Sequence, residues 1–228
     1  FNVQAQLAGE WIVGGIEAKC IAYGFALFAL TDWLNHRWNR MWLLLGAATA
    51  FHPIVGGWIS LLCGVTWFWE VLHTRVWRAS LLGLAGFAIL AAIGIVPALR
   101  LTWNENREVV DEASRIYVFE RLPHHLALLS LPTDEITRRV IRHGVLLGGL
   151  CMLAGMVRTS ATRRLAFFAA GAVVLALVGF AIEFLFRDQP LVAARILRYY
   201  WFRMSDFAVP LATALLLTAQ IGEGELRR

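Results

Sequence analysis

The stretch MWLLLGAATAFHPIVGGWISLLCGVTWFWEVL, residues 41–72, has no charged side chain before Glu70. As one helix it would be about 48 Å long at ~1.5 Å per residue, longer than the ~30 Å hydrocarbon core of a bilayer. His52-Pro53 and Gly56-Gly57 lie near its middle. Proline removes a helical hydrogen bond and disfavours a helical conformation at the preceding residue. The stretch therefore predicts two short membrane spans joined by a tight turn.

Apolar runs of this kind organise the whole chain. Hydrophobic residues make up 59% of the 228 residues and charged residues 16%, whereas a soluble domain carries about 25% charged residues. Runs approaching ~20 apolar residues are typical of membrane spans. The sequence predicts an all-α polytopic membrane helix bundle with about seven membrane segments, at residues 15–34, 41–55, 57–72, 79–99, 143–157, 165–186 and 206–221.

The beginning of the chain shows no targeting signal. It starts at Phe1 without an initiator methionine, and FNVQAQLAGEW (1–11) has neither a basic n-region nor an apolar h-region. We therefore expect residues 1–228 to form a single integral-membrane domain that belongs to a longer chain.

The arginines predict an orientation. With two spans in 41–72, the turns 35–40, 73–78 and 158–164 and the C-terminal tail lie on one side of the membrane, and each contains at least two arginines. Because cytoplasmic loops are enriched in basic residues, we expect these short loops to be cytoplasmic, in a bacterial cytoplasmic (inner) membrane. Arginines at the ends of apolar runs meet lipid headgroups, so the net charge of +5 indicates membrane lipids and no nucleic acid as partners.

The opposite, outer face receives the longer connections. A functional site is expected there, because loops on a rigid scaffold carry many binding and catalytic residues. Within the outer loop 100–142, apolar side chains repeat at helical spacing with charged side chains opposite, which predicts an amphipathic interfacial helix at 105–120. The residues of its apolar face are Val109, Val110, Ala113, Ile116 and Tyr117.

The first candidate site is FERLPHHL, residues 119–126, with Arg121, His124 and His125. Arginine offers paired donors to a phosphate, and a histidine can transfer a proton near neutral pH. A solvated loop at the level of the lipid headgroups is the alternative interpretation.

The second candidate site is RDQPLVAARILRYYWFRMSD, residues 187–206, in which Arg198 and Arg203 alternate with aromatic side chains. These arginines bind either the phosphate of a lipid-linked substrate or only lipid headgroups beside an aromatic belt. We expect Asp206 to orient one of them or to contact a sugar hydroxyl. Glu183 lies four residues before Arg187, a spacing that predicts an ion pair.

Glu17 and Lys19 in GGIEAK (14–19) lie about one turn inside the outer interface. In one interpretation, the Glu17 carboxylate faces a polar cavity. In the other, Glu17 lies near the positive end of a helix dipole and Lys19 extends outward to the interface.

GGIEAKCIAYGFALFAL (14–30) resembles the start of a middle helix in bacterial GT-C glycosyltransferases, membrane enzymes that take sugars from polyprenyl-phosphate donors. RMWLLLGAATAFHPIVGGWISLL (40–62) is similar to that family's small-residue helix, its basic-residue-then-proline turn and its apolar return helix. The resemblance covers about residues 10–75, and His52 stands where arginine is more usual. It implies a phosphate contact at His52, a substrate or metal contact at Glu17 and a catalytic base in an outer loop upstream of Phe1.

The expected function is therefore part of a lipid-linked-sugar-dependent glycosyltransferase with its site at the outer membrane face. A carboxylate would deprotonate the acceptor hydroxyl while arginine and histidine stabilise the departing phosphate. The implied partner is a polyprenyl-phosphate sugar donor. No cofactor is assigned, and the sequence leaves open whether a divalent metal is needed. The alternatives are a multispanning transporter or channel and a non-catalytic membrane scaffold. Walker A, GxSxG, HExxH and Rossmann motifs are absent from the sequence.

Overall fold

The computed structural model describes residues 6–8, 17–74, 77–103, 105–156 and 159–225, and regular secondary structure in these ranges is helical throughout. The predicted all-α fold is confirmed. The chain divides into two compact units, and each is described by itself. Residues 11–106 form the α1–α4 unit, and residues 1–10 together with 107–228 form the α5–α10 unit.

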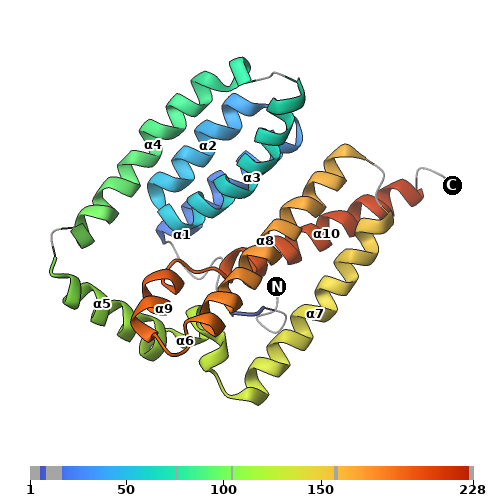
Figure 1. Cartoon of the computed structure of the whole chain (residues 1–228). Helices are drawn as coiled ribbons and strands as arrows, with labels where there is room; N and C mark the ends of the chain where they lie inside the picture. The colour runs from blue at the N-terminus through green and yellow to red at the C-terminus, as the bar shows by residue number, and fades with distance from the viewer. Residues whose placement is uncertain (1–5, 9–16, 75–76, 104, 157–158, 226–228) are drawn as a thin grey trace. The chain divides into compact units, whose positions relative to one another are not determined.

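Helix α2 is the centre of the α1–α4 unit, because it contacts each of the other three helices (Figure 1). Its side chains at Met41, Leu45 and Ala48 are fully buried. The bounds of the four helices are α1 (Ala18–Leu34), α2 (Trp38–Phe51), α3 (Pro53–Thr74) and α4 (Trp77–Trp103).

The break predicted in the apolar stretch 41–72 exists, but it lies at His52, before the predicted boundary at residues 55–57, because Gly56 and Gly57 are helical within α3. This residue has an extended backbone (φ −148°, ψ 94°) between the end of α2 and the first residue of α3, Pro53. The extended conformation is the one that a following proline favours. The His52 imidazole also caps α3, since its Nδ1 accepts a hydrogen bond of 3.3 Å from the backbone N–H of Val55.

The turn between α1 and α2 is held by a buried carboxylate. Asp32 is 3% exposed and pairs with Arg40 Nε at 3.2 Å and with Arg37 Nη1 at 3.7 Å. His36, whose φ of 58° closes the turn, lies with its Nδ1 3.2 Å from Glu70 Oε2 of α3. The basic turn 35–40 is therefore fastened to the helices on both sides of it.

Glycines let α2 and α4 approach backbone to backbone. A Cβ built on Gly83 of α4 would lie 2.6 Å from the Cα of Asn39, and one built on Gly94 would lie 2.5 Å from the carbonyl oxygen of Thr49. The Asn39 side chain uses this proximity, because its Oδ1 accepts a 2.7 Å hydrogen bond from the Gly83 N–H. Small residues that allow close contact are the usual basis of helix packing inside membranes.

The α5–α10 unit combines long apolar helices with short helices at one end. The short elements gather where α7 begins, α8 ends and α10 begins (Figure 1). The bounds are α5 (Arg107–Arg115), η2 (Ile116–Arg121), α6 (Pro123–Leu126), η3 (Leu128–Ser130), α7 (Thr133–Met156), α8 (Ser160–Leu185), α9 (Pro190–Leu197) and α10 (Arg203–Glu225).

Each of the seven predicted apolar runs is mostly helical where the structure describes it, with Glu17, His52 and Phe186 just outside the helices, but the helices differ in length. Within the described residues, five helices are long and apolar enough to cross a membrane: α3, α4, α7, α8 and α10. Helices α1 and α2, with 17 and 14 residues, are shorter than the 18 residues required of such a helix. An integral membrane protein with several spans fits these dimensions.

The segment 100–142, which the sequence predicted as an outer loop, contains more regular structure than expected. Helix α4 continues to Trp103, and α7 begins at Thr133, ten residues before the predicted run. The expected amphipathic helix exists as α5, but from Ile116 it widens into the π-helix η2. The polar first turns of α7 are stabilised by ion pairs at helical spacing, Asp134–Arg138 and Glu135–Arg139.

We expect Gly83→Ala to destabilise the α1–α4 unit by about 1–3 kcal/mol, because the added methyl meets Asn39 backbone atoms that cannot move aside. Thermal unfolding in detergent micelles, followed by tryptophan fluorescence, measures the effect. Gly57→Ala is the matched control, since a Cβ at Gly57 meets no atom within 4 Å. Equal unfolding temperatures for the two variants would contradict the close α2–α4 packing.

Candidate functional site

Polar side chains gather among the short elements of the α5–α10 unit. At their centre lies a two-residue segment from the start of the chain, Leu7 and Ala8, which we call the strap. The Asp206 carboxylate in the first turn of α10 accepts both strap N–H groups, at 2.6 Å from Leu7 N and 2.9 Å from Ala8 N. Asp206 is 1% exposed, so this contact is removed from water.

The strap carbonyls are bound as completely as its N–H groups. Arg139 Nη1 donates to the Leu7 carbonyl at 2.9 Å, and His125 Nδ1 lies 2.6 Å from the Ala8 carbonyl oxygen. A carbonyl oxygen only accepts, so His125 must carry its proton on Nδ1. Side chains from three different elements therefore bind every backbone polar group of the two strap residues.

Arg139 connects the strap to the neighbouring elements. Besides the Leu7 carbonyl, its Nη1 donates to the backbone carbonyl of His124 at 3.3 Å, and its Nη2 donates to Glu135 at 2.7 Å. The planar guanidinium can bind several acceptors at fixed angles, which a lysine could not do. The start of α7, helix α6 and the strap are thus joined by one side chain.

A second cluster surrounds Arg203 at the start of α10. Its guanidinium lies 3.8 Å from the ring centre of Tyr200, and the residue is 5% exposed. Tyr200 has φ of 59°, a left-handed conformation that costs free energy in a bulky residue, and its hydroxyl bonds that of Tyr117. The strained turn before α10 is therefore held by a cation–π contact and by a hydroxyl pair.

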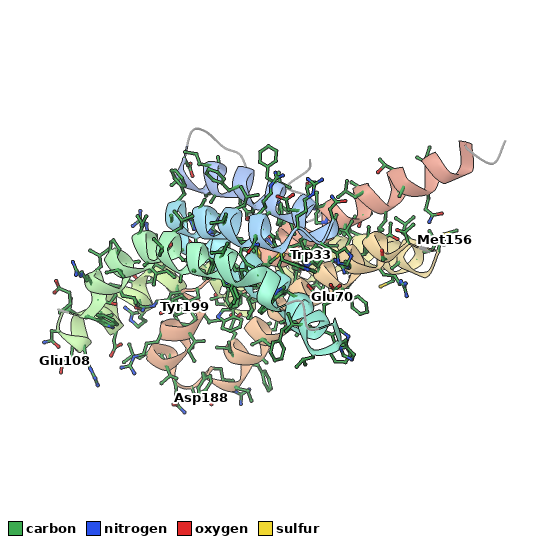
Figure 2. All side chains as sticks on the ribbon, turned by 90° about the horizontal axis from the view of Figure 1, so that it is seen from above. Trp33, Glu70, Glu108, Met156, Asp188 and Tyr199 are labelled. Carbon is green, nitrogen blue, oxygen red and sulfur yellow. The ribbon has the colours of Figure 1, made fainter. Side chains whose placement is uncertain are left out.

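Charged contacts fasten α5 to α9. Arg195 donates from Nε and Nη2 to both carboxylate oxygens of Asp111, and Arg198 Nη1 donates to Ser114 at 3.3 Å. The Arg195 hydrogen bond and positive charge lower the pKa of Asp111 below its ordinary value. Arg198 also bonds the Tyr199 hydroxyl at 3.0 Å and lies over that ring. Tyr199 and Asp188, the latter in the turn between α8 and α9, are labelled in Figure 2.

Two further buried polar contacts involve residues of the long apolar helices α7, α8 and α10. His143 Nε2 of α7 lies 2.8 Å from the Ser205 hydroxyl of α10. Glu183 of α8 accepts the Ser130 N–H at 2.9 Å instead of pairing with Arg187, whose ion pair is with Asp188. The predicted Glu183–Arg187 pair is therefore wrong, because a buried carboxylate is stabilised by the N–H groups at a helix start.

Five of the predicted site residues belong to the α5–α10 unit. Arg121 is exposed at the end of η2, and His124 and His125 are half-buried with ring centres 4.0 Å apart. Arg198 is half-buried, while Arg203 is buried. His125 is used for the strap, Arg198 for α5 and Arg203 for the Tyr200 ring.

The other two, Glu17 and His52, belong to the α1–α4 unit. Glu17 is exposed at the N-cap position of α1 and pairs with Lys19 at 3.3 Å, so it lies at a helix start, and its position at a membrane interface stays a prediction. His52 uses Nδ1 to cap α3. Their expected substrate and phosphate contacts stay predictions.

Sequence reasoning missed the strap and most of its partners. Asp206 was expected to face an arginine or a sugar, and the structure places strap N–H groups on both of its oxygens. Arg139 was not among the predicted site residues. Its spacing from Glu135 could have indicated their ion pair. Nothing local indicates the contact with Leu7, which lies 132 residues away.

The Asp111–Arg195 contact predicts how α9 depends on α5. Asp111→Asn should increase hydrogen exchange of the α9 amides, because the paired carboxylate is lost. The lowered pKa of Asp111 means that the contact stabilises the fold above the ordinary aspartate pKa of ~3.9 and is lost as the pH falls through the lowered value. Protection in the wild type, corrected for intrinsic exchange, should therefore stay constant between about pH 7 and 5.

Asp134→Asn is the control, since Asp134 pairs with Arg138 on the exposed surface of α7. Unchanged α9 exchange in Asp111→Asn would show that the contact does not hold the two helices together.

Two findings complete the description of the candidate site. Among the described residues, no group of three or more histidine, cysteine, aspartate or glutamate side chains could hold a metal ion. Compared with known proteins, the chain matches no family model, no curated protein and no solved structure.

Proposed function

We propose that the chain is part of a membrane glycosyltransferase that uses a lipid-linked sugar and binds the phosphate of that substrate in the α5–α10 unit. Arg198 carries the proposal. Its hydrogen bonds go to the neutral hydroxyls of Ser114 and Tyr199, and its charge acts on the Asp111 carboxylate without a hydrogen bond, so the guanidinium can still bind an anion. The residue is half-buried, and partial removal from water strengthens its attraction for a phosphate.

The position of the short elements in the α5–α10 unit also supports a phosphate as the ligand. The short elements lie at the ends of three helices that could cross a membrane, α7, α8 and α10. The exposed side chains of α5, η2 and the segment between α9 and α10 include apolar ones, such as Val109, Ile116 and Tyr199, and arginines such as Arg121. Apolar and basic side chains in one layer are typical of the membrane interface, where the phosphate of a lipid-linked sugar also lies.

In this proposal all seven apolar helices are membrane segments, and the short basic loops face the cytoplasm of a bacterial inner membrane. Helices α5 and α9 lie in the outer interface. Arg121, His124 and Arg198 contact the substrate phosphate and stabilise the charge that develops as it departs from the anomeric carbon. The base that deprotonates the acceptor hydroxyl is not assigned to any of these residues.

The proposal predicts selective binding of a polyprenyl phosphate. We expect decaprenyl phosphate to bind the full chain in lipid nanodiscs more tightly than decaprenol, which has the same tail and no phosphate. Arg198→Ala should weaken the phosphate ligand about tenfold, because one charge-assisted hydrogen bond contributes ~1.5–3 kcal/mol. Native mass spectrometry, which counts bound lipids, measures both affinities.

Arg163→Ala is the matched control, since Arg163 is an exposed arginine in the first turn of α8, at the opposite end of that helix. Equal binding of the phosphate and the alcohol, or equal losses in the two arginine variants, would overturn the proposal. A scaffold or transporter function would then account better for the chain.

A further inference from the structure

The strap forms hydrogen bonds with three polar side chains, Asp206, Arg139 and His125. The Asp206 carboxylate receives two donors on its two oxygens, at 2.6 and 2.9 Å. Arg139 and His125 receive one acceptor each, at 2.9 and 2.6 Å. Because Asp206 is buried and Arg139 and His125 are half-buried, leaving the carboxylate without donors would cost free energy, so the site needs an occupant with the same pattern of donors and acceptors.

A sugar phosphate head group has this pattern. The nitrogen atoms of consecutive residues are about 2.7–3.6 Å apart, depending on the backbone angle ψ, and the separation of two neighbouring hydroxyl oxygens of a hexose falls in the same range. A carboxylate can therefore accept from a vicinal diol as it accepts from the two strap amides. The oxygens of a phosphate can accept from Arg139 and His125 as the strap carbonyls do.

The strap and such a ligand cannot be bound at the same time. Leu7 is 5% and Ala8 1% exposed, and they pack against Leu128, Ala176 and Phe202. Their backbone groups occupy both Asp206 oxygens. Any ligand of Asp206 must first displace the strap.

The strap is attached in a way that allows displacement. Of its two side chains only Leu7 is large, and its polar contacts are made to side chains and not to a helix or sheet ladder. Segments held by few apolar contacts belong to the least stable parts of a fold and open first.

We propose that Leu7 and Ala8 are an internal, inhibitory occupant of a sugar phosphate site. Asp206 binds vicinal hydroxyls of the ligand, and Arg139 and His125 bind its phosphate oxygens, once the strap has left. The identity of the ligand rests on the proposed glycosyltransferase function. The displacement itself rests on the contacts of the strap.

Hydrogen exchange of the wild-type chain in nanodiscs tests displacement directly. A panel of glucose, mannose and galactose 1-phosphates provides the probes, with inorganic phosphate added separately. We expect at least one hexose phosphate to speed exchange of the Leu7 and Ala8 amides about tenfold, because each amide loses a hydrogen bond to a buried carboxylate. If the Leu7 and Ala8 amides stay as protected from exchange with each of the three hexose phosphates as without them, the proposal is overturned. An equal effect of inorganic phosphate alone would exclude the sugar contact.

Removing the strap should strengthen binding. Leu7→Asp places a charge in the apolar cluster around Phe202 and should expel the strap without altering Asp206, Arg139 or His125. Because the competent state is then no longer rare, affinity for the hexose 1-phosphate should rise about tenfold or more. If the strap has only a structural role, Leu7→Asp should leave the affinity for the hexose 1-phosphate unchanged or lower it. Either result would overturn the proposal. Circular dichroism and thermal unfolding verify that the variant is folded.

A second pair of variants isolates the carboxylate. Asp206→Asn replaces one acceptor oxygen by an N–H donor, so strap exchange should rise without ligand and the hexose phosphate should produce no further increase. Asp188→Asn, at an exposed position between α8 and α9, is the matched control and should behave like the wild type. Strap exchange in Asp206→Asn that equals the control would overturn the role of Asp206.

The strap and the proposed function can fail separately. If decaprenyl phosphate binds through Arg198 while no hexose phosphate moves the strap, the site proposed here is wrong and the glycosyltransferase proposal stands. If Leu7→Asp strengthens hexose phosphate binding while no variant binds decaprenyl phosphate, the site stands and the lipid-linked substrate is wrong.

Discussion

The polar network of the α5–α10 unit is built around the buried Asp206 carboxylate, which binds the strap amides in this structure. A carboxylate that is 1% exposed in the first turn of an apolar helix needs compensation for its lost hydration. Two N–H donors supply it, and the strap carbonyls in turn bind Arg139 and His125. Through Arg139 and Glu135 the same network holds the start of α7. Charges that would be costly separately stabilise one another as a network.

The α1–α4 unit is organised by a different constraint, which is the distance between backbones. In an apolar environment helices gain little from burying more apolar surface, so contact depends on shape and on a few hydrogen bonds. Gly83 and Gly94 remove the atoms that would keep α2 and α4 apart, and Asn39 bonds across the gap. At its end, Asp32 fastens the basic turn 35–40. The α1–α4 unit is thus held together by close steric fit between backbones, and the α5–α10 unit by hydrogen bonds to its polar side chains.

The sequence predicted those parts of the candidate site that depend on local spacing. Arg198 and Arg203 were placed correctly beside aromatic residues, because a segment rich in tyrosine and arginine brings such side chains together whatever the tertiary fold. The role of His125 was not predictable, because its partner is the carbonyl of Ala8, 117 residues away. Glu183 illustrates the same limit, since an acid four residues before an arginine predicts a pair, and burial selected the Ser130 N–H.

The sequence by itself determined that the chain is helical, where each apolar run lies, and that the stretch 41–72 breaks near its middle. These properties follow from hydrophobic periodicity and from the geometry of proline, which act over a few residues. Only the tertiary structure decided that Asp206 binds Leu7, 199 residues away, and that α5 is fastened to α9. Hydrogen bonds between distant residues depend on how the helices pack, and packing is a property of the whole surface of each helix.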